Sequence, residues 1–139
     1  MNDTILALLG YITWTLLLLV CLATYRTLLV AKKEQAVNGF KPDGSDSPAF
    51  GKRITRAQGN CVESFAFIGG LMLLALATNS ATITNGLALL LLVARLAQSI
   101  THLISTSVLA VQIRFTFFLV QIVICFYWVV LFASKFIGA

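Results

Sequence analysis

Charged residues are scarce in this chain. Only 11% of its 139 residues are charged, whereas 59% are hydrophobic and the mean hydropathy is +0.94. A soluble domain of this size could not cover so much apolar surface, so the composition excludes a soluble globular protein and indicates that a bilayer is the solvent. The net charge of +5 comes without the interleaving of basic and aromatic residues that is typical of RNA-binding segments. We therefore expect no nucleic-acid partner.

Metal ligands and nucleophile motifs are also scarce. The chain has one histidine, and its three cysteines lie singly in hydrophobic stretches without CxxC spacing. Structural zinc sites need closely spaced Cys and His ligands, so we expect neither a metal site nor a disulfide. The Gly-x-Ser-x-Gly turn of serine hydrolases is missing, and the combination of Ser99, His102 and Glu63 is too common to indicate such an enzyme. His102 is better explained as an interior or interface histidine.

The first apolar run contains no acidic residue. Residues 4–31 hold no Asp or Glu, and Glu63 is the one acid in any apolar stretch, with arginines beside it. Small four-span transporters of lipophilic cations need a membrane carboxylate in their first helix. The sequence therefore disfavours a cation transporter.

What the chain does contain is four long apolar stretches. Residues 4–25 and 115–134 are uncharged, and so are residues 64–94. That middle stretch is too long for one span and is broken at residues 78–86 by a cluster of turn and cap residues. A helix needs about 20 residues to cross a hydrocarbon core of about 30 Å. The pattern predicts an all-α, integral membrane four-helix bundle, a single domain over residues 1–139, with spans of roughly 4–31, 51–78, 84–106 and 109–136.

Basic residues set the expected orientation. The segment from residue 31 to residue 56 holds six of them, whereas the turn at residues 78–86 holds none. The positive-inside rule therefore places the first loop in the cytoplasm and both termini on the opposite side, although Lys135 argues weakly for the reverse. The start of the chain lacks the basic segment of a cleavable signal, so we expect the first span to be retained. Residues 38–48, rich in Pro, Gly, Ser and Asp, form the one true loop.

The second predicted span opens with a stripe of polar side chains. At about 100° per residue, Arg53, Arg56, Asn60 and Glu63 fall within an arc of about 80° on one helical face. A charged group near the bilayer centre costs about 2.5–3.5 kcal/mol on insertion scales, so the stripe needs protein or ligand partners. It is either a binding site or the polar contact that joins the helices. An ion pair of Arg56 with Glu63 and interhelical hydrogen bonds of Asn60 would explain it without a ligand.

Two further spans carry polar residues. On the third, Arg95, Gln98 and His102 share one face; on the fourth, Arg114 and Gln121 are seven residues apart and nearly eclipsed. Three arginines are thus presented from three helices, whereas the one glutamate can neutralise only one of them. This surplus of positive charge favours an anionic ligand.

The stripe resembles the signature of a known membrane family. Residues 53–63 read R-x-x-R-A-Q-x-N-C-x-E, which is similar to the second-helix motif of the leukotriene synthase branch of the MAPEG family, the membrane-associated proteins of eicosanoid and glutathione metabolism. The similarity continues at residues 93–96 and 112–114 and, with four spans and a long first loop, covers essentially the whole chain. The resemblance implies a homotrimer of four-helix protomers that binds glutathione between neighbouring subunits near the cytoplasmic face.

The resemblance also assigns roles to residues. It implies that Arg114 stabilises the glutathione thiolate and is the catalytic residue. Ser64 stands where glutathione-using relatives have tyrosine, which removes one hydrogen bond to the ligand. Lys32 is the alternative to Lys33 as the basic residue that ends the first helix. Glutathione itself would be held by six residues: Arg53, Arg56, Asn60, Glu63, Arg95 and Lys33.

The leading hypothesis is therefore a bacterial-type, membrane-bound glutathione transferase or peroxidase. It would activate the glutathione thiol for attack on lipophilic electrophiles that arrive from the bilayer, with glutathione as co-substrate and no metal. We expect a multi-pass protein of the bacterial inner membrane. The alternative is a non-catalytic lipid-binding or structural member of the same family, which the serine at position 64 favours.

Overall fold

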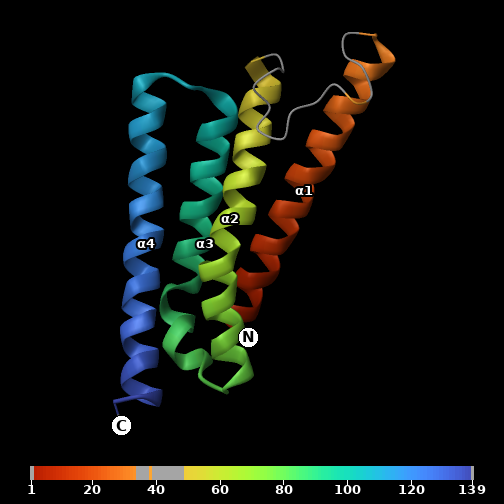
Figure 1. The fold of residues 1–139 in the computed structure, drawn as a ribbon. Helices are drawn as coiled ribbons and strands as arrows, with labels where there is room; N and C mark the ends of the chain where they lie inside the picture. Colours follow the sequence, from red (N-terminus) through yellow and green to blue (C-terminus); the bar gives the residue numbers. More distant parts are fainter. Residues whose placement is uncertain (1, 34–37, 39–48, 139) are drawn as a thin grey trace.

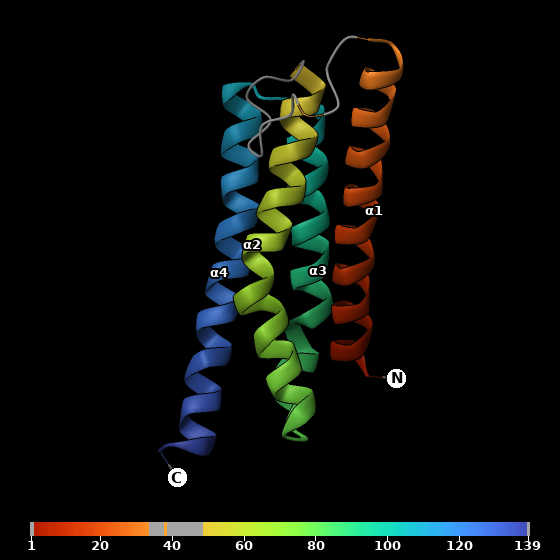
Figure 2. The same cartoon turned by 45° about the vertical axis from the view of Figure 1, so that its right-hand side comes forward.

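Four long helices make up the described part of the chain. The computed structural model describes residues 2–33, 38 and 49–138. The helices run up and down, so that both termini lie at one end of the bundle, the terminal end, and the last turn of α1, the first turn of α2 and the α3–α4 turn lie at the other, the loop end (Figure 1, Figure 2). This confirms the predicted all-α, integral membrane four-helix bundle. The helices, each long and apolar enough to cross a membrane, are α1 (Asp3–Ala31), α2 (Ala49–Ala77), α3 (Ala81–Ile104) and α4 (Val108–Phe136).

The observed helix bounds differ from the predicted spans mainly at the start of the third. The sequence predicts a start at residue 84, but α3 begins at Ala81, because the turn after α2 is short. Asn79 takes a left-handed conformation (φ 54°), and the backbone N–H of Ser80 donates to the carbonyl of Ala75 at 2.7 Å. Thr84, which we expected at the helix start, already lies in the first turn of α3, where its hydroxyl donates to Ala81 O at 3.3 Å.

Side-chain caps define two other helix starts. Asn2 accepts a hydrogen bond from Thr4 N (2.9 Å) at the start of α1, and Ser107 accepts one from Ala110 N (3.2 Å) at the start of α4. Such caps satisfy backbone N–H groups that have no partner within the helix and contribute about 1 kcal/mol each. The loop predicted at residues 38–48 lies, apart from its first residue, outside the described residues.

Helix α3 is central to the packing. It contacts α1, α2 and α4, whereas α1 and α4 do not touch within the described ranges. Small residues let the helices approach closely, as is usual in membranes: a Cβ atom on Gly10 of α1 would lie 2.7 Å from Leu92 Cδ2 of α3. The largest fully buried apolar side chains are Trp128, Tyr11, Ile54, Ile68, Met72 and Leu91.

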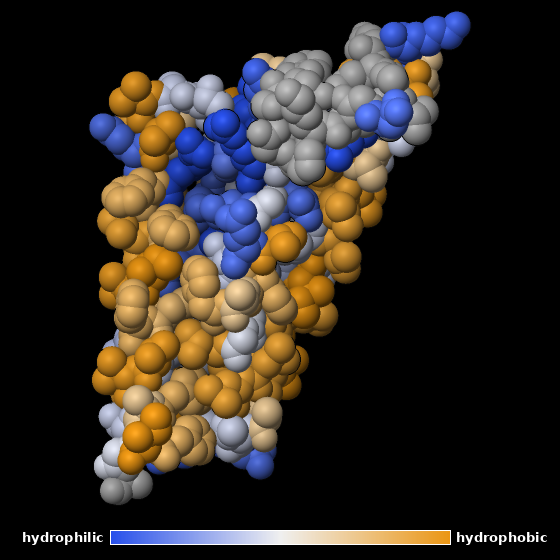
Figure 3. Space-filling view, in the orientation of Figure 1, coloured by the Kyte–Doolittle hydropathy of each residue, from blue (hydrophilic) through white to orange (hydrophobic). Residues whose placement is uncertain are grey.

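The outer surface divides along the bundle axis. Figure 3 shows hydrophobic side chains over most of one face and hydrophilic side chains gathered toward the loop end. Large apolar residues on α4, such as Val123 and Phe126, are 65% and 69% exposed. Exposure of this kind is unfavourable in water but suits contact with lipid or with another subunit. A polar site is therefore to be sought at the loop end.

Candidate functional site

A closed ring of four polar side chains lies between α2, α3 and α4. The guanidinium of Arg95, which is 1% exposed, donates through Nε to Gln121 Oε1 (2.8 Å) and through Nη1 to Asn60 Oδ1. Gln121 Nε2 donates to Gln98 Oε1 (2.7 Å), and Gln98 Nε2 donates to Asn60 Oδ1 (3.1 Å), which closes the circuit. We call Asn60, Arg95, Gln98 and Gln121 the amide ring. It joins three helices through hydrogen bonds at the depth where the bilayer offers none.

The charge of Arg95 fixes the orientation of every amide in the ring. A guanidinium can only donate, so the atoms of Asn60 and Gln121 that face it must be oxygens. The amide nitrogen of Gln121 then faces Gln98, whose own nitrogen must turn to Asn60. As a result Asn60 Oδ1 accepts two hydrogen bonds, and Asn60 Nδ2 is left as a donor for a group outside the ring.

Arg95 is stabilised by neutral groups. Its hydrogen bonds go to amide oxygens, and its Cζ lies 5.6 Å from the centroid of the Tyr11 ring on α1. A cation over an aromatic face is stabilised by about 2 kcal/mol when both are desolvated. Arg95 Nη2 is buried and has no hydrogen-bond partner among the described residues. Of the three arginines in the predicted charge surplus, Arg95 is thus enclosed within the protomer.

The other two arginines lie nearer the loop end, beside a histidine. Arg56 on α2 is exposed, Arg114 on α4 is half-buried, and His102 on α3 is buried. The charges of Arg56 and Arg114 both act on His102, and that of Arg56 acts on Arg114, so the three side chains lie within electrostatic range of one another. Arg114 Nε is buried and makes no hydrogen bond within the described part of the chain. We call Arg56 and Arg114 the arginine pair; its charge, which no acid of the described residues compensates, would attract an anion.

Arg53 serves the bundle itself. Its Nε donates to Leu103 O (2.8 Å), and its guanidinium lies 5.8 Å from the Phe50 ring centroid. Leu103 is in the last turn of α3, where carbonyl groups have no partner within the helix and carry partial negative charge. Arg53 therefore caps α3, and only the rest of its guanidinium is available to a ligand.

Glu63 lies apart from Arg56 on the same helix. Seven residues separate them, a rise of about 10.5 Å, which is too long for an ion pair, and none forms between them in the described residues. Glu63 is exposed, about 21 Å along α2 from its first residue, so a lone protomer would turn a carboxylate toward the hydrocarbon. Lys33, exposed just after α1, makes no side-chain hydrogen bond or ion pair with these residues over the ranges described.

Tyr11 is a polar residue that the sequence patterns did not single out. Besides lying against Arg95, it donates from its hydroxyl to Cys61 O (2.6 Å), which joins α1 to α2. The available signal was a lone tyrosine in the N-terminal half of an otherwise apolar span. Ser64 is 3% exposed and faces the protomer interior, whereas its neighbour Glu63 faces outward. The stripe itself is also divided, because Asn60 contacts α3 whereas Arg56 and Glu63 are exposed.

The cysteines form neither a redox pair nor a metal centre in the described residues. Cys21, Cys61 and Cys125 are free thiols, and Cys61 Sγ lies 3.3 Å from the hydroxyl oxygen of Ser99. The described residues contain no group of three or more His, Cys, Asp or Glu side chains that could hold a metal ion. Cys61 instead helps to pack α2 against α3.

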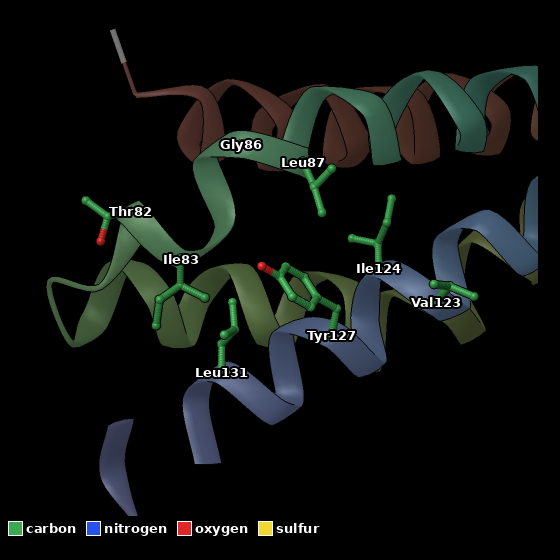
Figure 4. Close-up of a pocket in the computed structure, with 8 residues that line it drawn as sticks. All are labelled: Thr82, Ile83, Gly86, Leu87, Val123, Ile124, Tyr127 and Leu131. Atoms are coloured by element: carbon green, nitrogen blue, oxygen red, sulfur yellow. The ribbon is translucent and has the colours of Figure 1, made fainter. Parts of the chain in front are cut away.

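A large apolar groove lies far from the arginine pair. It has a volume of about 830 Å³ and runs between the first turns of α3 and the second half of α4, toward the terminal end (Figure 4). A charged peptide would find few polar partners there. The polar site and this groove are thus separate features. The groove is lined by Thr82, Ile83, Gly86, Leu87, Val123, Ile124, Tyr127 and Leu131.

Comparison with known proteins gives one result. The sequence model of the MAPEG family matches residues 4–134, which include all of the amide ring and the arginine pair. No curated protein and no solved structure matches the chain.

Proposed function

Since the chain belongs to the MAPEG family, and is therefore an integral multi-pass membrane protein of the glutathione and eicosanoid metabolism family, we propose that it is a glutathione transferase. It activates the glutathione thiol for attack on lipophilic electrophiles, with lipid hydroperoxides as a further substrate class. The observation that carries the proposal is the arginine pair, whose charge is not compensated within the described residues. Arg114 has a buried Nε without a partner in the described residues, and Arg56 lies within electrostatic range of it.

The exposed part of the stripe suits glutathione. At neutral pH this tripeptide carries two carboxylates, one ammonium group and two amide carbonyls. In our proposal Arg56 binds a carboxylate, Glu63 binds the ammonium group, and the free Nδ2 of Asn60 donates to a carbonyl. Lys33 and Arg53 add positive charge at the loop end. The division of the stripe supports this arrangement, because Arg56 and Glu63 are exposed while Asn60 is held by the amide ring.

Arg95 contributes through Asn60 in this proposal. Its side chain is enclosed, and its Nε and Nη1 are engaged by Gln121 and Asn60. It therefore acts as a positioning residue that turns the Asn60 amide nitrogen toward the ligand.

The proposed chemistry depends on Arg114. A thiol with a pKa near 8.5 is only about 3% thiolate at pH 7, and a cation in a site of low dielectric can lower that pKa by about two units. The proton leaves to water. The thiolate sulfur then forms a bond to the electrophilic carbon, while the leaving group departs with its electron pair. A site inside the membrane gives direct access to apolar electrophiles, which concentrate in lipid.

We further propose a homotrimer in a bacterial inner membrane, with the first loop in the cytoplasm. The exposed carboxylate of Glu63 supports association, because a membrane-embedded charge needs a partner and a neighbouring subunit or a ligand held between subunits can provide it. The basic residues at the loop end support the orientation: Lys32, Lys33, Lys52, Arg53 and Arg56.

A calorimetric titration of glutathione into the detergent-solubilised protein tests the proposal. Arg56→Ala should weaken binding at least about tenfold through loss of a charge-assisted hydrogen bond. Lys52→Ala, which removes a neighbouring exposed cation on α2, is the matched control and should bind like wild type. Conjugation to a general electrophile and reduction of a hydroperoxide are then assayed. No saturable heat together with rates equal to the uncatalysed ones would refute the proposal.

A non-catalytic lipid-binding role is the second candidate. The residue that favours it is Ser64, whose buried hydroxyl gives the ligand no contact where relatives have tyrosine. A pure lipid binder would give no saturable heat with glutathione, so the same titration separates the two candidates.

A further inference from the structure

The groove between α3 and α4 leads toward a lysine, Lys135, which marks its charged end. Along α4, Val123, Tyr127 and Leu131 line it at intervals of four residues, and Lys135 is the next residue in that series. From residue 123 to residue 135 the helix rises about 18 Å, close to half of a hydrocarbon core of about 30 Å. The lining residues of α4 themselves span about 12 Å of this rise, and Lys135 lies one turn beyond them.

A hydrogen bond closes the charged end. Lys135 Nζ donates to Ser80 Oγ at 2.8 Å, and Ser80 directly precedes α3, which forms the opposite wall. An ammonium group has three N–H donors, so two remain for a ligand. Lys135 is exposed in the last turn of a span, where long basic side chains reach the headgroup region. The one described acid near this end of the bundle, Asp3, is on α1, which does not touch α4.

The other apolar grooves contain no such residue. Those between α1 and α3, α1 and α2, and α2 and α4 are lined by apolar residues, threonine, glycine and one cysteine, with no charged side chain. An acyl chain could lie in any of them, but only the α3–α4 groove, among these, offers charge complementarity to a headgroup.

We propose that the α3–α4 groove binds one anionic phospholipid, with an acyl chain along Val123, Tyr127 and Leu131 and the phosphate at Lys135. The apolar walls provide contact area for the chain, and the ammonium group selects a headgroup with net negative charge over a zwitterionic one. This site is at the opposite end of the bundle from the arginine pair and does not depend on glutathione binding.

Native mass spectrometry of the full-length protein in detergent tests the site. The protein is titrated with phosphatidylglycerol and, separately, with phosphatidylcholine of the same acyl chains. Wild type should prefer phosphatidylglycerol by about fivefold, the effect of one basic residue near a membrane surface. Lys135→Gln should remove that preference while still binding both lipids. An unchanged preference in Lys135→Gln would overturn the role of the lysine.

Gly86→Leu tests the groove. A Cβ atom on Gly86 meets nothing within 4 Å, so a leucine can enter the open space and displace an acyl chain. A Cβ atom on Gly70 of α2, outside this groove, likewise meets nothing within 4 Å, so Gly70→Leu is the matched control. Gly86→Leu should lose most binding of both lipids, whereas Gly70→Leu should bind like wild type. Wild-type lipid binding by Gly86→Leu would overturn the proposal.

The same spectra identify other occupants. If a second copy of the chain filled the groove, Gly86→Leu would change the number of subunits in the assembly without lipid, and the phospholipid assignment would fail. A titration with oleate, a free carboxylate, tests whether the site binds fatty acids. If oleate binds more tightly than phosphatidylglycerol, and Lys135→Gln and Gly86→Leu abolish that binding, the site belongs to fatty acids instead. Should Gly86→Leu not fold, the surface variant Lys135→Gln still decides the matter.

Discussion

The two ends of this bundle are built on different principles. In the half of the bundle nearer the loop end, α2, α3 and α4 are joined by the amide ring, a closed set of hydrogen bonds around a buried cation. Toward the terminal end, the same α3 and α4 meet through apolar side chains and leave a groove between them (Figure 4). The amide ring therefore orients hydrogen-bond donors and acceptors, whereas toward the terminal end the contacts between α3 and α4 are mainly apolar packing.

This difference has a physical basis in the membrane. Lipid tails are as apolar as leucine, so burial of an apolar side chain against a neighbouring helix stabilises the bundle only through better packing. Hydrogen bonds, in contrast, have no water to compete with them in the hydrocarbon core. A site that must orient a ligand is thus most precise where a polar network holds it, whereas an apolar groove selects mainly by shape.

The largest expected effect tests packing toward the terminal end. Trp128 is fully buried in the core, so Trp128→Ala should lower the free energy of unfolding by on the order of 3 kcal/mol through the cavity that it leaves. Phe126→Ala on the same helix, where the ring is 69% exposed, is the control and should change little. Unfolding in mixed detergent micelles measures both. Equal losses in the two variants would mean that packing of α4 does not distinguish inside from outside.

The second effect tests chemistry at the loop end. Under the proposed function, Arg114→Ala should lower the rate of glutathione conjugation about 100-fold, equivalent to about 2.7 kcal/mol, because the thiolate loses its cation. The affinity for glutathione should fall much less, since Arg56 and Asn60 remain. Arg114→Lys should keep part of the rate by retaining the charge. A loss of binding without loss of rate in the bound complex would assign Arg114 to binding instead.

The third effect tests the amide ring. Gln121→Leu removes the acceptor of Arg95 Nε and the donor to Gln98, which leaves polar groups buried and unsatisfied. We expect a loss of about 1–3 kcal/mol in the free energy of unfolding. Gln112→Leu, an exposed glutamine on the same helix, is the matched control. If both variants unfold like wild type, the ring does not stabilise the loop end.

Sequence alone predicted the helices well because hydropathy is a local property. Uncharged runs located all four spans, and the least accurate boundary, the start of α3, depended on the conformation of Asn79 rather than on composition. The presence of polar stripes was equally visible, since it needs only the helical period.

What sequence could not predict is which part of a stripe faces inward. Arg53 and Asn60 contact α3, whereas Arg56 and Glu63 are exposed, although all four lie within about 80° on a helical wheel. The border between an interface and a surface is narrower than that arc, and tertiary packing sets its position. Tyr11 was missed for the same reason, because its contact with Arg95 joins α1 to α3 across the bundle.

The smallest expected effect asks whether the terminal end has any polar specificity of its own. There the hydroxyl groups of Thr4 and Thr84 lie 2.5 Å apart, and Thr4 Oγ1 is also 2.7 Å from Asn85 Oδ1, so α1 is tied to α3. Interhelical hydrogen bonds in membranes average about 0.6 kcal/mol, and Thr4→Val keeps the side-chain volume, so we expect a loss of about that size. Thr13→Val, at an exposed position of α1, is the control.

A double-mutant cycle with Thr84→Val isolates the contact itself. If the two hydroxyl groups interact, the combined variant loses less than the sum of the single losses. The same cycle with Gln121→Leu and Gln98→Leu measures the coupling within the amide ring. If the two coupling energies are equal, both ends rely on polar contacts to a similar degree. A coupling near zero would leave helix packing as the main determinant of the terminal end, and would assign polar specificity in this protein to the amide ring.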